Sequence, residues 1–163
     1  MTRSVRRLAA IALGGIAVAV SLTACQQGST DMSHRPPIHE VVDRYDATVS
    51  ELRDVVSAAY PDASWTEDGA PSQAAGKTDG TVVVTSSIWY AEVPLADDEP
   101  ARDRLLKKAD EVVRSHGFAA FSVVQAVPGD FSYVTGDTWG GELHFSGGKS
   151  VTIRYTTGEH PAH

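Results

Sequence analysis

Apolar residues recur every three or four positions in two segments, and this spacing is typical of amphipathic helices. We expect the first helix over about Pro37 to Tyr60, ended by Pro61. We expect the second to start at the acidic run before Pro100 and to end near His116. The stripes are Ile38, Val41, Val42, Tyr45, Val49, Leu52, Val55, Val56 and Ala59 in the first, and Ala101, Leu105, Ala109, Val112, Val113 and His116 in the second. Both stripes are expected to face a core.

The end of the second helix carries two further signals. Gly117 can adopt the left-handed conformation that often closes a helix. His116 is then a last-turn residue, and we expect it to interact with the free carbonyl groups there rather than to act as a catalyst.

Strand composition dominates the rest of the chain. We expect one strand over Thr81–Val93, others over Phe118–Val127 and Phe131–Thr138, and a closing hairpin. Residues 61–80 are rich in Gly, Pro, Asp and Ser and are expected to be irregular. Trp65 stands out within that polar stretch, either as a plug over the core or as a surface on which a ligand stacks.

The closing hairpin has two possible registers. A two-residue turn at Gly147-Gly148 would place the apolar residues of its two strands on opposite faces. A three-residue loop over 147–149 instead pairs Phe145 with Val151 and Leu143 with Ile153, and sets Glu142 against Arg154. We therefore predict the three-residue loop, with one inward-facing set: Leu143, Phe145, Val151, Ile153 and Tyr155.

These elements predict an α+β fold, with two helices packed on one face of a mostly antiparallel sheet of about five strands. The chain has no internal repeat at a period of 20 to 50 residues, so residues 38–163 are expected to form a single α+β domain.

The first 24 residues are typical of an exported protein and not of a fold. Arg3, Arg6 and Arg7 precede an apolar run, Leu8–Val20, of 13 residues. That run is too short to cross about 30 Å of hydrocarbon as a stable helix. A buried amphipathic core helix is the alternative, but the run has no polar face. We expect residues 1–24 to be a signal peptide.

The only cysteine, Cys25, closes the run Leu22-Thr23-Ala24-Cys25, which resembles the bacterial lipobox. By that resemblance the Cys25 sulfur takes a diacylglyceryl thioether and the signal is cleaved after Ala24. Acyl chains such as palmitate would then hold the protein at the extracytoplasmic face of the cell membrane. The alternative is an ordinary secretory signal with a chance cysteine. Residues 25–37, polar and ending in Pro36-Pro37, are expected to be the lipidated N-terminus and a flexible linker.

The charge balance narrows the range of partners. Cleavage after Ala24 would remove three of the 14 basic residues and none of the 21 acidic ones, so the formal net charge would change from −7 to about −10. Such a domain is not suited to nucleic acid or to an anionic membrane surface, so the Cys25 anchor must provide the membrane contact. With Cys25 modified, no disulfide can form.

Few residue patterns point to chemistry. The six histidines, His34, His39, His116, His144, His160 and His163, are scattered, and a structural metal site needs three or four converging ligands. No nucleophile elbow, metalloprotease motif or phosphate-binding loop is present. We therefore expect no catalytic residues, no metal and no cofactor, and a protein that is not an enzyme.

The order of these features resembles that of small lipoproteins of mycobacteria and other actinobacteria, the LppA-like group. The similarity covers the lipobox, the polar linker, both helices and a closing hairpin that ends in Tyr155-Thr156-Thr157-Gly158. Members often carry a cysteine just after this Thr-Thr-Gly, bonded to a cysteine earlier in the domain. In this chain the position is Glu159. The resemblance implies an envelope location and a fold, and it does not imply an activity.

Three classes of function remain open. We favour a non-catalytic envelope lipoprotein that binds an envelope protein or a cell-wall component through its sheet face or the surfaces near Trp65 and Trp139. The alternatives are a carrier of a lipid or other apolar ligand and an unrecognised hydrolase.

Overall fold

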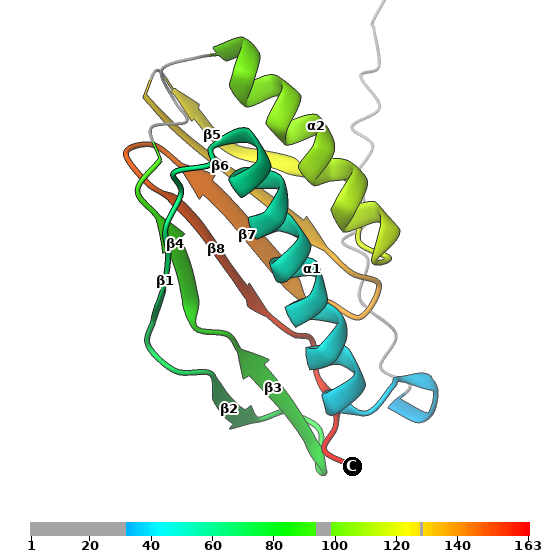
Figure 1. Cartoon of the computed structure of the whole chain (residues 1–163). Coiled ribbons are helices and arrows are strands. Elements are labelled where there is room, and N and C mark those ends of the chain that lie inside the picture. Colours follow the sequence, from blue (N-terminus) through cyan, green and yellow to red (C-terminus); the bar gives the residue numbers. More distant parts are fainter. Residues whose placement is uncertain (1–31, 94–98, 128) are drawn as a thin grey trace, which may run out of the picture.

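The computed structural model describes residues 32–93, 99–127 and 129–163, and these residues form an α+β fold. Both helices lie on the same face of one sheet (Figure 1). The elements, in chain order, are η1 (Met32–His34), α1 (Ile38–Ala59), β1 (Trp65–Asp68), β2 (Ser72–Ala75), β3 (Thr81–Thr85), β4 (Ile88–Ala91), α2 (Glu99–Ser115), β5 (Ser122–Val127), β6 (Asp130–Gly136), β7 (Glu142–Gly147), β8 (Val151–Thr156) and β9 (His160–Pro161). No helix within the described ranges combines the length and the apolar character needed to cross a membrane.

The sheet contains nine strands, so the expectation of about five was wrong. Its main path is β1-β4-β8-β7-β6-β5, and β3 pairs with β2, β8 and β9. All of these pairs are antiparallel. Two of the additional strands, β1 and β2, lie in the stretch expected to be irregular. Their side chains are almost all exposed, so they lack the alternation that predicts a strand.

The strand expected over Thr81–Val93 is broken at Ser86 and Ser87 into β3 and β4. The Ser86 backbone N–H donates to the Tyr155 carbonyl at 3.0 Å, and the Tyr155 N–H donates to the Ser86 hydroxyl at 2.9 Å. A serine side chain thus replaces a backbone acceptor beside β8. The strand changes direction there, and Ser86 and Ser87 line a pocket beneath α1.

The closing hairpin has the predicted inward set but not the predicted pairs. Leu143, Phe145, Val151 and Ile153 are fully buried and Tyr155 is nearly so. Phe145 pairs with Ile153 and Leu143 with Tyr155, so the loop is one residue further along, at 148–150. The physical reason is the packing of Phe131, which pairs with position 147 of β7. The Phe131 ring occupies the space that a Cβ at position 147 would need, so Gly147 belongs to the strand and not to the loop. Glu142 consequently lies opposite Thr156 and not Arg154.

Most of the two predicted helical stripes forms the other half of the core, whereas Ala59, at the end of the first stripe, is exposed. Ile38, Val41, Tyr45, Val49, Leu52 and Val56 of α1 and Leu105, Ala109 and Val113 of α2 are buried. Gly117 has the expected left-handed backbone, with φ of 83°. The expectation for His116 was wrong: it follows the last residue of α2, and its Nε2 lies 3.1 Å from Glu51 Oε1 of α1. The two helices are close enough for this side-chain pair to form in place of a contact with backbone carbonyls.

Candidate functional site

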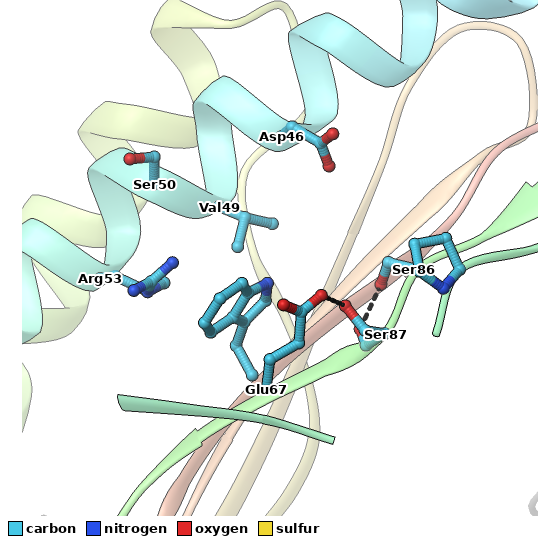
Figure 2. A pocket seen from close by; sticks show the side chains of 9 residues that line it. Asp46, Val49, Ser50, Arg53, Glu67, Ser86 and Ser87 are labelled. Atoms are coloured by element: carbon cyan, nitrogen blue, oxygen red, sulfur yellow. Dashed lines mark hydrogen bonds between the residues drawn. The ribbon is translucent and has the colours of Figure 1, made fainter. Parts of the chain in front are cut away.

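A pocket of about 280 Å³ lies between α1 and the part of the sheet where β3 gives way to β4 (Figure 2). Concave sites with a few convergent polar groups are the usual places for a small ligand to bind. The lining residues are Asp46, Val49, Ser50, Arg53, Glu67, Pro71, Ser86, Ser87 and Trp89.

A helical spacing and a strand pairing bring these residues together. Asp46, Ser50 and Arg53 are four and three positions apart on α1, so they share the helix face that borders the pocket. Across the pocket, Glu67 of β1 pairs directly with Trp89 of β4. Directly opposite residues in an antiparallel pair point to the same face, so Glu67 and Trp89 lie side by side beneath the helix.

The guanidinium group of Arg53 is held by aromatic rings. Its central carbon lies 3.7 Å from the centre of the Trp89 ring and 5.5 Å from that of Trp65, both within the range of cation–π attraction. Its Nε is buried and has no hydrogen-bond partner in the described part of the chain. No ion pair joins Arg53 to a carboxylate among the described residues. The positive charge is therefore fixed in place without being neutralised.

The two carboxylates of the pocket are held by hydroxyl groups. Ser87 donates to Glu67 Oε1 at 2.5 Å, and Tyr155 donates to Asp46 Oδ1 at 2.7 Å. Burial, followed by the hydrogen bond to Asp46, raises the pKa of Tyr155 well above its ordinary value. Tyr155 therefore stays protonated and remains a donor to Asp46. Each carboxylate is thus held at the pocket by a hydroxyl group and not by a cation.

Trp65 adjoins the pocket and is half-buried. It begins β1, its indole Nε1 donates to Ser57 Oγ at 3.1 Å, and one ring face is near Arg53. It also packs against the buried core cluster. The interpretation of Trp65 as a plug over the core matches these contacts, and the ring also extends the wall that holds Arg53.

Trp139 lies near the opposite end of α1. Its ring makes an edge-to-face contact with His160 and faces the guanidinium of Arg44 at 4.7 Å. Arg44 and Ser57, the partners of the two tryptophans on α1, are 13 positions apart, which corresponds to about 20 Å along a helix. Trp65 and Trp139 therefore belong to two separate surfaces.

The polar cluster beneath Trp139 is built around Asp137, whose side chain is 1% exposed. Its carboxylate accepts from Arg44 Nη2 at 2.7 Å, from the Tyr45 hydroxyl at 3.0 Å and from the N–H groups of Trp139 and Gly141. Burial, with Asp137 adding to it, raises the pKa of Tyr45. This buried network of hydrogen bonds holds the β6–β7 loop against α1.

The same end of the domain holds the residues that follow the expected linker. Arg35 Nη1 donates to the carbonyls of Trp139 and Glu159, and His160 Nδ1 lies 3.0 Å from the carbonyl of Pro36. Burial lowers the pKa of His160. Residues 35 and 36, at the end of the expected linker, are thus attached to the C-terminal segment.

Glu159 directly follows the Tyr155-Thr156-Thr157-Gly158 run. Its carboxylate accepts from the backbone N–H of Lys77 at 2.9 Å and of Thr78 at 3.3 Å. These hydrogen bonds lower the pKa of Glu159, with Lys77 the largest cause. The carboxylate connects the C-terminal segment to the β2–β3 turn without a covalent bond.

Cys25 and Ala24 lie outside the described residues. The histidines that fall inside the described ranges remain apart, and no group of three or more His, Cys, Asp or Glu residues there is arranged to hold a metal ion.

The pocket residues were not predicted from the sequence. Arg53 belongs to the polar face of α1, where charged residues are usually solvated, and Trp89 belongs to a strand-like apolar run. One available signal was the Ser86-Ser87 pair, two small polar residues that interrupt that run.

Comparison with known proteins gives a consistent result. Residues 20–160 match the family model of LppA, described as a lipoprotein confined to pathogenic Mycobacterium. The fold is similar to the crystal structure of the lipoprotein LppA from Mycobacterium tuberculosis, with 17% identity, a TM-score of 0.59, and coverage of 77% of this chain and 78% of that one. It is also similar to a DUF4853 family protein from Actinomyces odontolyticus, with 18% identity, a TM-score of 0.62, and coverage of 82% and 74%. No curated protein matches the sequence. Because the family model spans most of the chain, this protein belongs to the LppA family of lipoproteins.

Proposed function

We propose that this protein is a membrane-anchored envelope lipoprotein with a non-catalytic binding role, and that its binding surface is the α1–β4 pocket together with Trp65. Family membership supports the envelope location. The apolar run and Cys25 support a lipid anchor at the extracytoplasmic face of the membrane, with cleavage after Ala24.

The observation that carries the binding role is the Arg53 guanidinium, held between Trp89 and Trp65 at the pocket. Arginine and tryptophan are the residue types that most often dominate the energy of a binding interface. The pocket lining contains three serines but no histidine or lysine to activate one of them, which supports binding in preference to hydrolysis.

The test is a comparison of two tryptophan variants in envelope extract. The full chain, Trp65→Ala and Trp139→Ala are each captured from detergent-solubilised envelope, and the copurifying proteins and cell-wall fragments are quantified. We expect Trp65→Ala to lose them and Trp139→Ala to retain them. Loss with Trp139→Ala alone would move the binding surface to the other end of α1, and no loss with either variant would count against the proposal.

A second candidate function, carriage of an apolar ligand, is favoured by a neighbouring pocket of about 360 Å³. Its lining includes Ile38, Val42 and Val84, and it shares Pro71 with the first pocket. Mass spectrometry of organic extracts from the purified full chain tests this function. A lipid that is present in stoichiometric amount and absent from Val42→Gln would support the carrier, and extracts without lipid would argue against it.

A further inference from the structure

The α1–β4 pocket contains charges of both signs that do not neutralise one another. Arg53 lies over the Trp89 ring, and Glu67 pairs directly with Trp89 on the neighbouring strand. Figure 2 shows the Arg53 and Glu67 side chains in the same pocket. Each is held by an uncharged partner: Arg53 by the two indoles, and Glu67 by the Ser87 hydroxyl. Asp46, across from Ser86 and held by Tyr155, adds a second negative charge.

Asp46 and Glu67 are exposed to solvent, so neither carboxylate needs an ion pair to compensate for lost water, whereas Arg53 is partly buried. Here Arg53 has no ion-pair partner within the described residues, and its buried Nε has no acceptor. A guanidinium that cannot be deprotonated keeps the N–H donors of its two terminal nitrogens for an anionic group. Across the pocket, a fixed carboxylate provides an acceptor for a cationic group.

We infer that the pocket binds an α-amino-acid group, in which a carboxylate and an ammonium are carried by the same carbon. The carboxylate would meet Arg53, and the ammonium would meet Glu67 with Asp46 nearby. The volume of about 280 Å³ lies just below the usual range for ligand pockets, which fits a group of this size better than a long chain. A plain anion would be repelled by the two carboxylates, and a plain cation by Arg53. This inference rests on the proposed function, since it names the ligand of the same site.

The three tryptophans of the chain provide the measurement. The experiment is an NMR titration of the full chain purified in detergent. The indole N–H resonances of Trp65 and Trp89 report the pocket, and that of Trp139, at the other end of α1, is an internal control. Alanine is the probe. We expect alanine to shift the first two signals saturably and to leave the third unchanged. Acetate and ethylammonium, each carrying one of the two charges, should bind at least about tenfold more weakly.

Two substitutions remove one charge each. Arg53→Gln and Glu67→Gln should each weaken alanine binding about tenfold or more. Glu67→Gln also guards against a folding defect in Arg53→Gln, because Glu67 is exposed. The matched control is Asp68→Asn, which makes the same charge change on the opposite face of β1 and should bind alanine as the unaltered chain does.

The source of the amino-acid group is decided by two peptides. In γ-glutamylglycine the α-amino-acid group is free at one end, whereas in α-glutamylglycine its carboxyl group is blocked by the peptide bond. Binding of the γ-linked peptide would assign the site to an amino-acid group carried on a larger molecule, and binding of alanine alone would assign it to free amino acids. Equal binding of both peptides would overturn the requirement for the two charges on one carbon.

Three further results would overturn the inference: no shift with alanine, acetate binding as tightly as alanine, or unchanged binding in both charge variants. If these occur while Trp65→Ala still loses its copurifying partners, the proposed binding role stands and only the ligand class is wrong. If neither alanine nor any partner depends on this surface, both proposals fail.

Discussion

The Arg53 guanidinium lies 3.7 Å from the centre of the Trp89 ring, so a residue of the polar face of α1 rests on an aromatic residue of the sheet. Arginine commonly stacks on aromatic faces because its delocalised charge is weakly hydrated. The contact places a fixed positive charge at the edge of the core, where the adjacent Glu67 and Ser87 provide the other polar groups of the pocket.

The hairpin register leads to a prediction about stability. Ile153 is fully buried and pairs with Phe145 and Trp89, so Ile153→Ala should lower the free energy of unfolding by about 2–5 kcal/mol. Thr152 points to the other face, and Thr152→Ala should change it by no more than about 0.5 kcal/mol. Denaturant melts of residues 33–163 measure both. Reversed sensitivities would mean that the strand presents its other face to the core.

The buried carboxylate of Asp137 leads to a second prediction. Asp137→Asn removes the negative charge that Arg44 contacts. The amide nitrogen also cannot accept a hydrogen bond, so one side of the new side chain loses the acceptor that Asp137 provides. We expect a loss of about 3–5 kcal/mol in unfolding free energy. Asp54→Asn, an exposed residue of α1, is the matched control and should change the melt little. Equal effects of the two substitutions would contradict the role of the network.

Glu159 makes a contribution to stability that depends on pH. Hydrogen bonds from Lys77 and Thr78 hold its pKa below the ordinary value of 4.5, so the ionised form is favoured in the folded chain. The contribution is therefore fully present above pH 4.5 and is lost as the pH falls through the lower folded-state pKa.

Glu159→Gln tests this dependence. The variant should be less stable than the unaltered chain at neutral pH, and the difference should shrink on acidification, as followed by denaturant melts across the acidic range. Glu111→Gln, an exposed residue of α2, is the control. A stability difference for Glu159→Gln that does not change with pH would argue against the ionised link.

The last prediction concerns the anchor at Cys25. Because a thiol is needed to form the thioether, Cys25→Ala should give a precursor that is neither lipidated nor cleaved after Ala24. Incorporation of a clickable fatty acid and the mass of the protein measure the two steps. Equal labelling of the variant would exclude Cys25 as the lipidated residue.

Local patterns were sufficient to predict the elements whose side chains face one common core. The stripes of α1 and α2 and the inward residues of β7 and β8 follow from periods of 3.6 and 2, which depend only on neighbouring positions. Strands β1 and β2 were not predictable in this way, because they are exposed and have no buried face to produce a pattern.

What the tertiary structure decided is where distant residues meet. The hairpin register depends on Phe131, a residue of a third strand, whose ring needs the space above Gly147. The pocket depends on Arg53, Glu67 and Trp89, which lie on three different elements, and on the break of the sheet at Ser86. By itself the sequence determined the two helices and the buried faces, and it predicts lipidation from the lipobox-like run that ends at Cys25, since each is a property of a short continuous segment. The register and the binding pocket arise from packing between segments, and no short stretch of sequence encodes that packing.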